Sequence, residues 1–471
     1  MIAQEIYMKA KRFLTITFVL CASACASRTP ADKGGVAIVP DAFTVGKVID
    51  TVWCRDDSSQ TYALYIPVRG NAQPLPVLYL FDPHAAGALP LRKYKALADT
   101  YGFILIGSNN SKNGNDWSMA ERIWYRLSQD TRSRLKIDSS RIYTGGFSGG
   151  AKVAGYVALQ HPGIKGVIAN GAGLPDETAP GNFPFSFTAV AGEGDMNRSD
   201  LISFSAELDK SATRHRLLLF DGKHEWAPEN TIELALLGLQ FDAMRNGTLA
   251  KDEALIRGFE EKSKKKVEDD IRTKQLIRAE QECVLAISCL DGLVGGADWF
   301  RQKLGAVQSS AEYQQEKKAQ EALLVKEQQI KAEYQQHFQQ EDMTYWTNVI
   351  SDLQVKADSK ITERAMYQRL LAYLSLAFYS ISNHLINANE NGAADHFVLL
   401  YKMADPTNSE AWYFSAVLHA RNNQPQAATG DLLKAVGYGF NDEGRMMRQL
   451  EFQSLAGQMD LRGIKSKMKK N

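Results

Sequence analysis

Between residues 43 and 247, short and almost wholly apolar segments recur, separated by stretches with helical periodicity. These segments are 77–81, 103–107, 141–144, 166–169, 185–190 and 216–220. A strand that is apolar throughout is buried on both faces, and parallel strands need crossover connections, which are usually helices. The pattern therefore predicts an α/β fold over residues 42–247, with a doubly wound, mostly parallel sheet and helices on both faces. Residues 45–52 and 62–67 are expected to pair as a hairpin at its start.

The sequence changes character after residue 247. Strand signals disappear, and Glu, Lys, Gln and Ala dominate. Residues 248–346 are expected to form a charged region of long helices, because 311–340 contain no Gly or Pro and many good helix formers. Residues 347–471 are expected to form a second, all-α helical domain.

From residue 367 to residue 439 the sequence matches itself at a shift of 34 residues. The aligned pairs include Phe378 with Trp412, Ser382 with Ala416, Ala394 with Ala428, and Val398 with Leu432. Aromatic, small, small and large apolar residues in this order and at this period resemble tetratricopeptide repeats, which are antiparallel helix pairs. An irregular helical bundle is the alternative. The resemblance implies a surface for a protein partner.

The first 24 residues are expected to be a signal peptide. Lys9, Lys11 and Arg12 form a positive region before the apolar run 13–20, which is too short to anchor the chain in a bilayer. Cys25 follows small residues in a pattern similar to the lipobox of bacterial lipoproteins, whereas the Ala at position 22 departs from it, so ordinary cleavage stays open. We expect residues 25–41 to be a tether. The protein is then exported to the periplasm or the outer membrane surface, and touches membrane only through a lipid on Cys25.

Composition excludes some classes of function. Lys and Arg number 55 and Asp and Glu 54, so no basic surplus drives nucleic-acid binding through counterion release, and we expect no nucleic-acid partner. Five Cys in 471 residues are too few for a disulfide scaffold, and they show no C-x-x-C spacing typical of zinc sites. We expect neither a metal nor an organic cofactor.

A candidate nucleophile, Ser148, lies in the G-x-S-x-G motif of residues 146–150. The motif alone is weak, but the strand predicted over 141–144 precedes it and a helix predicted over 151–159 follows. A strand, a sharp turn and a helix are what a nucleophile elbow requires, because the turn lifts the Ser Oγ above the sheet. The helix N-terminus adds partial positive charge beside a developing oxyanion.

A Ser hydroxyl needs a base to accept its proton. Downstream of Ser148 the α/β part contains His161, His215 and His224. His161 ends the helix after the elbow and His215 precedes a strand, so both are expected to be structural or at the surface. His224 follows the last predicted strand, at the sheet edge where such folds place their chemistry. His224 is therefore the predicted base.

The base in turn needs a carboxylate to orient it. Asp195 follows the strand predicted over 185–190 and precedes His224 by about thirty residues. Glu193, in the same loop, is the competing candidate. The predicted orienting acid is Asp195.

The order Ser148, Asp195, His224, each in a strand context, resembles the α/β-hydrolase fold. More narrowly, it resembles the exported esterase branch related to feruloyl esterases, polyhydroxyalkanoate depolymerases and predicted peptidases, in which the last loop often reads G-x-H-x-W, as residues 222–226 do. The resemblance covers 43–247. It implies a serine hydrolase in which Ser148 attacks an acyl carbon and His224 shuttles the proton while Asp195 orients it, through an acyl-enzyme.

The resemblance also implies an oxyanion hole in the loop after the third strand, here residues 80–87. Ala85 stands where the family usually has Gly, which leaves open which backbone N–H points inward. The predicted donors are the N–H groups of Ala85 and Gly149.

The substrate expected from the resemblance is an ester, with a carbohydrate-linked ester before a short peptide. Only about a dozen residues separate 173 from 185, where many relatives carry a lid, so the site is expected to be open and to suit a bulky ester. The polar loop 108–117 either lines the cleft or is a surface loop. A rival interpretation is a vestigial hydrolase in a scaffold protein whose repeats recruit a partner, but a relic has no chemical reason to keep a complete triad.

Overall fold

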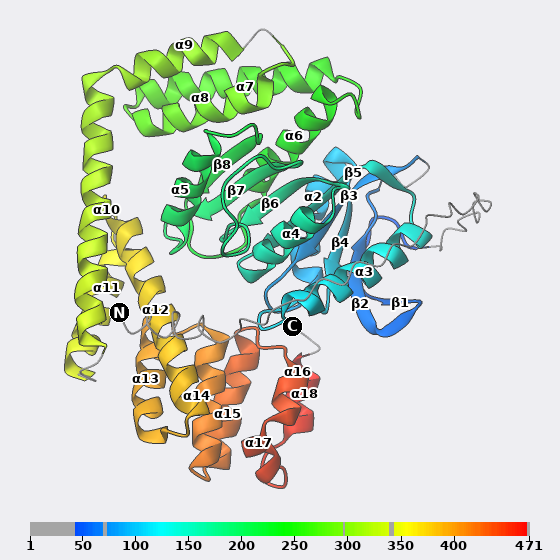
Figure 1. Ribbon diagram of the computed structural model, residues 1–471. Coiled ribbons are helices and arrows are strands. Elements are labelled where there is room, and N and C mark those ends of the chain that lie inside the picture. Colours follow the sequence, from blue (N-terminus) through cyan, green and yellow to red (C-terminus); the bar gives the residue numbers. More distant parts are fainter. Residues whose placement is uncertain (1–42, 69–72, 295–296, 339–342, 469–471) are drawn as a thin grey trace, which may run out of the picture.

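The computed structural model describes residues 43–68, 73–294, 297–338 and 343–468. The predicted signal peptide, the tether and Cys25 lie outside these ranges. An α/β part comes first along the chain and a helical part follows (Figure 1). Within the described ranges, no helix has the length and apolarity needed to cross a membrane.

One eight-stranded sheet forms the centre of the α/β part. Its strands are β1 (Ile49–Cys54), β2 (Asp57–Tyr65), β3 (Leu75–Phe81), β4 (Ile104–Ser108), β5 (Ile137–Phe147), β6 (Ile164–Asn170), β7 (Ser186–Gly192) and β8 (His215–Phe220). Their order is β1-β2-β4-β3-β5-β6-β7-β8. The expected hairpin is antiparallel, β2 pairs antiparallel with β4, and all other neighbours are parallel. This order confirms the predicted α/β-hydrolase fold.

Helices cover both faces of the sheet (Figure 1). They are α2 (Ala88–Tyr101) and α6 (Glu229–Arg245) on one face, and α3 (Trp117–Arg134), α4 (Gly149–Gln160) and α5 (Arg198–Leu208) on the other. Alternate residues of β3 enter the two cores, with Leu78 and Leu80 in the first and Val77 and Tyr79 in the second. A strand with apolar residues at every position is required for this double burial.

Three further helices extend the first of these cores beyond residue 247. They are α7 (Glu253–Arg272), α8 (Leu276–Leu290) and α9 (Ala297–Gln308). Phe259 and Cys283 belong to the same apolar cluster as Phe241 of α6, and the rings of Phe241 and Phe259 meet edge to face at 5.2 Å. The hydrophobic core is therefore continuous across the position at which we expected the first domain to end.

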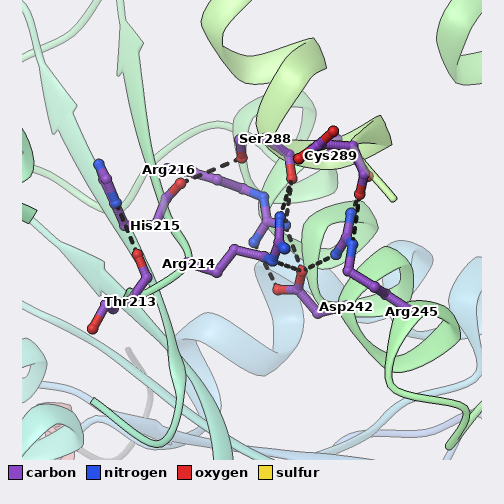
Figure 2. A network of polar contacts seen from close by, with 9 residues as sticks. Thr213, Arg214, His215, Arg216, Asp242, Arg245, Ser288 and Cys289 are labelled. Atoms are coloured by element: carbon purple, nitrogen blue, oxygen red, sulfur yellow. Dashed lines mark hydrogen bonds and ion pairs between the residues drawn. The ribbon is translucent and has the colours of Figure 1, made fainter. Parts of the chain in front are cut away.

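A buried ionic network fastens α8 to the sheet (Figure 2). The Arg216 guanidinium on β8 donates to both oxygens of Asp242 on α6, at 2.8 and 2.7 Å. Arg245 donates to the same carboxylate at 2.7 Å and to the carbonyl of Cys289 at 2.7 Å. Arg214 donates to the carbonyl of Ser288, and its Nε atom lies 3.5 Å from the Asp242 carboxylate. Three cations share one carboxylate because the C-terminal carbonyls of α8 supply additional negative charge.

The helical part begins with a single long helix, α10 (Ala311–His337), which runs from α7–α9 to the remaining helices (Figure 1). The others are α11 (Met343–Asp358), α12 (Arg364–Asn387), α13 (Asn391–Ala404), α14 (Ser409–Arg421), α15 (Pro425–Gly437), α16 (Glu443–Arg448), α17 (Leu450–Ser454) and α18 (Leu461–Met468). They share a second core, separate from those of the sheet. This confirms the predicted all-α region.

The boundaries of four of these helices follow the interval of the sequence repeat. Helix α12 ends at Asn387 and α14 at Arg421, while α13 begins at Asn391 and α15 at Pro425, so each boundary recurs after 34 residues. The aligned Ala394 is fully buried, as is its counterpart in α15. Assignment of these pairs to the tetratricopeptide class stays a prediction.

Candidate active site

Ser148 occupies a strained turn between β5 and α4. Its φ is 53° and its ψ −124°, a conformation that a residue with a side chain adopts only when its surroundings impose it. Two glycines make the turn sterically possible: a Cβ on Gly146 would lie 2.2 Å from the carbonyl oxygen of Gly150, and one on Gly150 would lie 2.0 Å from that of Phe81. The G-x-S-x-G motif thus folds as strand, turn and helix.

The structure brings His224 and Asp195 to this serine. The Nε2 atom of His224 lies 3.0 Å from Oγ of Ser148, and its Nδ1 atom lies 3.0 Å from both carboxylate oxygens of Asp195. Asp195 has no exposed surface and accepts a further hydrogen bond from the N–H of Asn197 at 2.8 Å. The Phe147 ring lies against the imidazole at 4.7 Å. The three residues come from loops after β5, β7 and β8, at one edge of the sheet.

The competing residues are placed elsewhere. Glu193 forms an ion pair with Arg198 at 2.6 Å and is not hydrogen-bonded to His224. His161 lies 3.0 Å from a carboxylate oxygen of Glu121. His215 lies 3.2 Å from Asp209. The geometry therefore joins Asp195, not Glu193, to the imidazole nearest Ser148.

A second carboxylate, which the sequence analysis did not single out, fixes the loops around the site. Asp82 follows β3 and accepts a hydrogen bond from the indole N–H of Trp226 at 2.9 Å and one from the backbone N–H of His84 at 2.8 Å. Burial alone would raise the pKa of Asp82, but the hydrogen bonds from His84 and Trp226 outweigh it and hold this pKa below its usual value. Trp226 of the G-x-H-x-W sequence thus ties the His224 loop to the loop after β3.

One of the two expected oxyanion donors is not free to act. The N–H of Ala85 donates to the carbonyl oxygen of Asp82 at 3.1 Å, within its own turn. Ala85 has a φ of 59°, the left-handed conformation that glycine adopts most easily. The expectation for Ala85 is therefore not supported. Gly149 stands at the first position of α4, where the N–H has no acceptor within the helix.

Ser148 and His224 open into a cavity of about 490 Å³ that lies between the α/β part and the helical part. The α/β side contributes Phe147, Lys112 and Asn113 among others. The opposite wall comes from α12, α13, the start of α14 and the segment around α16, and includes Tyr379, Tyr401, Asp405, Glu410, Asp442 and Arg445. The volume lies in the range of small-molecule sites.

This wall corrects the expectation of an open site. The short segment between 173 and 185 provides no large lid, as predicted, but the helical part covers the cleft instead. Lys112 and Asp442, from opposite sides, form an ion pair at 2.5 Å. No local sequence signal marks the wall residues, because their role depends on how two distant parts of the chain pack.

The polar loop 108–117 divides between the two roles considered for it. Lys112, Asn113 and Gly114 line the cavity. Trp117 instead stacks on Tyr156 at 4.8 Å and is 44% exposed. The side-chain oxygen of Asn113 lies so close to the N-terminus of α4 that a Cβ on Gly149 would be 1.9 Å from it. Asn113 is therefore a site residue that the sequence indicated only as part of a loop.

Comparisons with known proteins find sequence relatives that are named as esterases. No protein-family profile matches the chain. Acetylxylan esterase A of Aspergillus oryzae and a probable acetylxylan esterase A of Aspergillus flavus are each 22% identical to it over 257 residues, which cover 48% of this chain and 82% of theirs.

Solved structures with similar folds include two hydrolases. The feruloyl esterase module from Clostridium thermocellum, complexed with sinapinate, gives a TM-score of 0.33 and 11% identity over 46% of this chain and 93% of its own. An S-formylglutathione hydrolase from Agrobacterium tumefaciens gives a TM-score of 0.28 and 18% identity over 35% of this chain and 83% of its own.

Proposed function

We propose that the protein is a serine hydrolase that cleaves carboxylic esters. The observation that carries this proposal is the hydrogen-bonded chain from Ser148 through His224 to the buried Asp195. His224 Nε2 removes the proton from Ser148 as its Oγ attacks the acyl carbon, and returns it to the departing alcohol. Asp195 holds the imidazole in the tautomer that leaves Nε2 free to accept, and stabilises the imidazolium once formed. Water then attacks the acyl-enzyme with His224 again as base.

The tetrahedral intermediate carries negative charge on its oxygen, which needs donors fixed in advance. The N–H of Gly149 is one donor, because it projects without an intrahelical acceptor at the positive end of α4. The second donor we propose is the Nδ2 amide of Asn113, because Asn113 lines the same cavity. The atom of Asn113 nearest to Gly149 is Oδ1, which only accepts, so Nδ2 is the group that would have to face the oxyanion. This assignment replaces Ala85, whose N–H is bonded to Asp82.

The substrate class we propose is a carbohydrate-linked ester. The sequence relatives are named as acetylxylan esterases. Serine peptidases also use a Ser-His-Asp triad. The triad therefore does not distinguish an esterase from a peptidase, and the preferred substrate does.

Kinetics on a small ester test the proposal. Ser148→Ala and His224→Ala should each lower kcat about 10⁴-fold or more on 4-nitrophenyl acetate, and the double variant should be scarcely worse, because the residues act as a unit. Asp195→Asn should lower kcat by a somewhat smaller factor, while the matched Glu193→Gln should keep most of the activity. An acetylated xylo-oligosaccharide should be hydrolysed faster than a peptide anilide. Full activity in Ser148→Ala refutes the proposal.

We propose in addition that the protein is exported and acylated at Cys25. The support is the positive, apolar and small-residue pattern of the first 25 residues. The wild-type protein should partition into the detergent phase of a two-phase extraction, and Cys25→Ser should move it to the aqueous phase. If the wild-type protein is found wholly in the aqueous phase of the periplasmic fraction, acylation at Cys25 is wrong and ordinary signal-peptide cleavage is the remaining explanation.

A further inference from the structure

The cavity wall that faces the catalytic serine belongs to the helical part, and its polar groups are of two kinds. Its charged groups are mostly paired: Arg445 donates to both oxygens of Glu410 at 2.9 and 2.7 Å, and Lys112 pairs with Asp442 across the cavity. The guanidinium of Arg445 also lies over the Tyr413 ring, 4.1 Å from its centroid. These cations already have partners, so the wall does not offer a binding site to an anionic ligand.

Asp405 differs from these groups. Ser375 and Asn408 donate to its Oδ2 atom at 3.2 and 3.0 Å, and within the described residues nothing is hydrogen-bonded to Oδ1 and no cation is paired with the side chain. An ionised carboxylate oxygen only accepts hydrogen bonds, so a ligand at Oδ1 must donate. A hydroxyl is a neutral donor of this kind.

Two tyrosine side chains line the same cavity as this acceptor. Tyr379 and Tyr401 line the cavity, 6.1 Å apart between ring centroids, and the Tyr379 ring stacks on Phe414 at 5.6 Å. Among the described groups none is hydrogen-bonded to the Tyr379 hydroxyl, which is available as donor or acceptor. Tyr401 is buried, so the half-buried Tyr379 presents the apolar ring surface here. An apolar ring next to oriented polar groups suits a ligand ring that carries both C–H bonds and hydroxyl groups, which is the chemistry of a sugar.

We propose that the wall formed by Asp405, Tyr379 and Tyr401 is the subsite for the sugar of the ester, with the acyl group held at Ser148. The assignment rests on the proposed esterase function and adds that the helical part selects the alcohol. A cavity of about 490 Å³ between two walls suits a short acylated oligosaccharide better than an internal stretch of a polymer. The helical part therefore determines specificity.

The test uses the full-length protein and two esters with the same acyl group, O-acetylated xylobiose and 4-nitrophenyl acetate. The variants are Asp405→Asn, which keeps the shape but removes the charge, and Tyr379→Phe, which removes only the hydroxyl. Asp395→Asn, exposed on α13 and outside the cavity lining, is the matched control. We expect the ratio of kcat/KM for the sugar ester to that for the nitrophenyl ester to fall about tenfold in Asp405→Asn and about threefold in Tyr379→Phe. The control should keep the wild-type ratio.

The outcomes separate the two proposals. If the wild-type protein hydrolyses 4-nitrophenyl acetate through Ser148 but Asp405→Asn keeps the wild-type ratio of the two kcat/KM values, the sugar subsite is wrongly assigned. The proposed esterase function is then still supported. If the wild-type protein hydrolyses neither ester, both the proposed esterase function and the proposed sugar subsite are wrong. If Asp405→Asn instead impairs hydrolysis of an N-acetylated amino acid anilide relative to 4-nitrophenyl acetate, the wall binds peptides and the sugar assignment is overturned.

Discussion

The Arg369 guanidinium on α12 donates a hydrogen bond to the Glu193 carbonyl oxygen at 2.6 Å, in the loop that carries Asp195. Arg369 is buried and also pairs with the buried Glu327 on α10, at 2.8 and 2.6 Å. Gln368, the neighbouring residue, packs so tightly on the same loop that a Cβ on Gly194 would lie 2.5 Å from its side-chain oxygen. The helical part thus supports the acid of the triad as well as covering the cavity.

Replacement of Arg369 tests this support. Arg369→Met removes the contact with the acid loop and leaves the buried Glu327 with Lys331 as its one remaining ion-pair partner among the described residues. We therefore expect the free energy of unfolding to fall by about 3 kcal/mol. Arg364→Gln is the control, because Arg364 pairs with Asp221 at the surface of the same interface, where an ion pair contributes about 1 kcal/mol or less. Urea unfolding measures the free energy of unfolding of both variants. An equal decrease in the two variants would mean that the burial of Arg369 does not add to the stability that its contacts provide.

The Asp242 network predicts a pH dependence of stability. Burial alone would raise the pKa of Asp242, but Arg216 and Arg245 outweigh it and hold this pKa below its usual 3.8. The stability that this shift contributes is present above about pH 3.8 and is lost as the pH falls through the lower pKa of the folded state. Asp242→Asn should cost about 3 to 5 kcal/mol at pH 7, because Arg216 stays buried without its counterion.

Urea unfolding between pH 7 and pH 3 checks the sign of this effect. The difference in unfolding free energy between wild type and Asp242→Asn should be constant down to about pH 4 and then shrink. A difference that grows in acid would mean that Asp242 is protonated in the folded protein at neutral pH.

The sheet and the elbow were predictable because their signals are local. A strand such as β3 must be apolar on both faces, and Ser148 needs flanking glycines for its turn, so sequence alone marks both. The cavity wall has no such mark. Lys112 and Asp442 are 330 residues apart, and the pairing depends on the packing of two parts whose relative placement no local pattern encodes.

The end of the first core was equally hard to place from sequence. The change in composition at residue 247 is real, yet apolar residues of α7 and α8, such as Phe259 and Cys283, belong to the same core as α6. Helix periodicity shows that a helix has an apolar face but not which core receives it. The turn at Ala85 illustrates a further limit, because the motif locates the loop whereas its internal hydrogen bond to Asp82 is visible only in the structure.

Phe259 tests whether α7 belongs to the catalytic unit. Phe259→Ala should lower the free energy of unfolding by about 3 to 5 kcal/mol, because the ring is buried against Phe241. Esterase activity and α-helical circular dichroism should be lost together at the lowered melting temperature. Val284→Ala, at an exposed position of α8, should change stability by less than about 0.5 kcal/mol. Thermal inactivation unchanged in Phe259→Ala would indicate that the hydrolase unit ends near residue 247.

Asn113 tests the revised oxyanion hole. Asn113→Ala should lower kcat about 10²-fold on 4-nitrophenyl acetate and change KM little, because the donor acts mainly in the transition state. The matched change Asn230→Ala, at an exposed position of α6 and outside the cavity lining, should keep most of the activity. Wild-type kcat in Asn113→Ala would exclude its amide as the donor.

Covalent labelling tests whether Ser148 is an activated nucleophile or the remnant of one in a scaffold protein. The full-length protein is incubated with a fluorophosphonate probe, and the labelled site is identified by peptide mass spectrometry. We expect one adduct on Ser148, no labelling in Ser148→Ala and much slower labelling in His224→Ala, because the base must remove the serine proton. An unlabelled wild-type protein, or an adduct on another residue, would contradict this expectation.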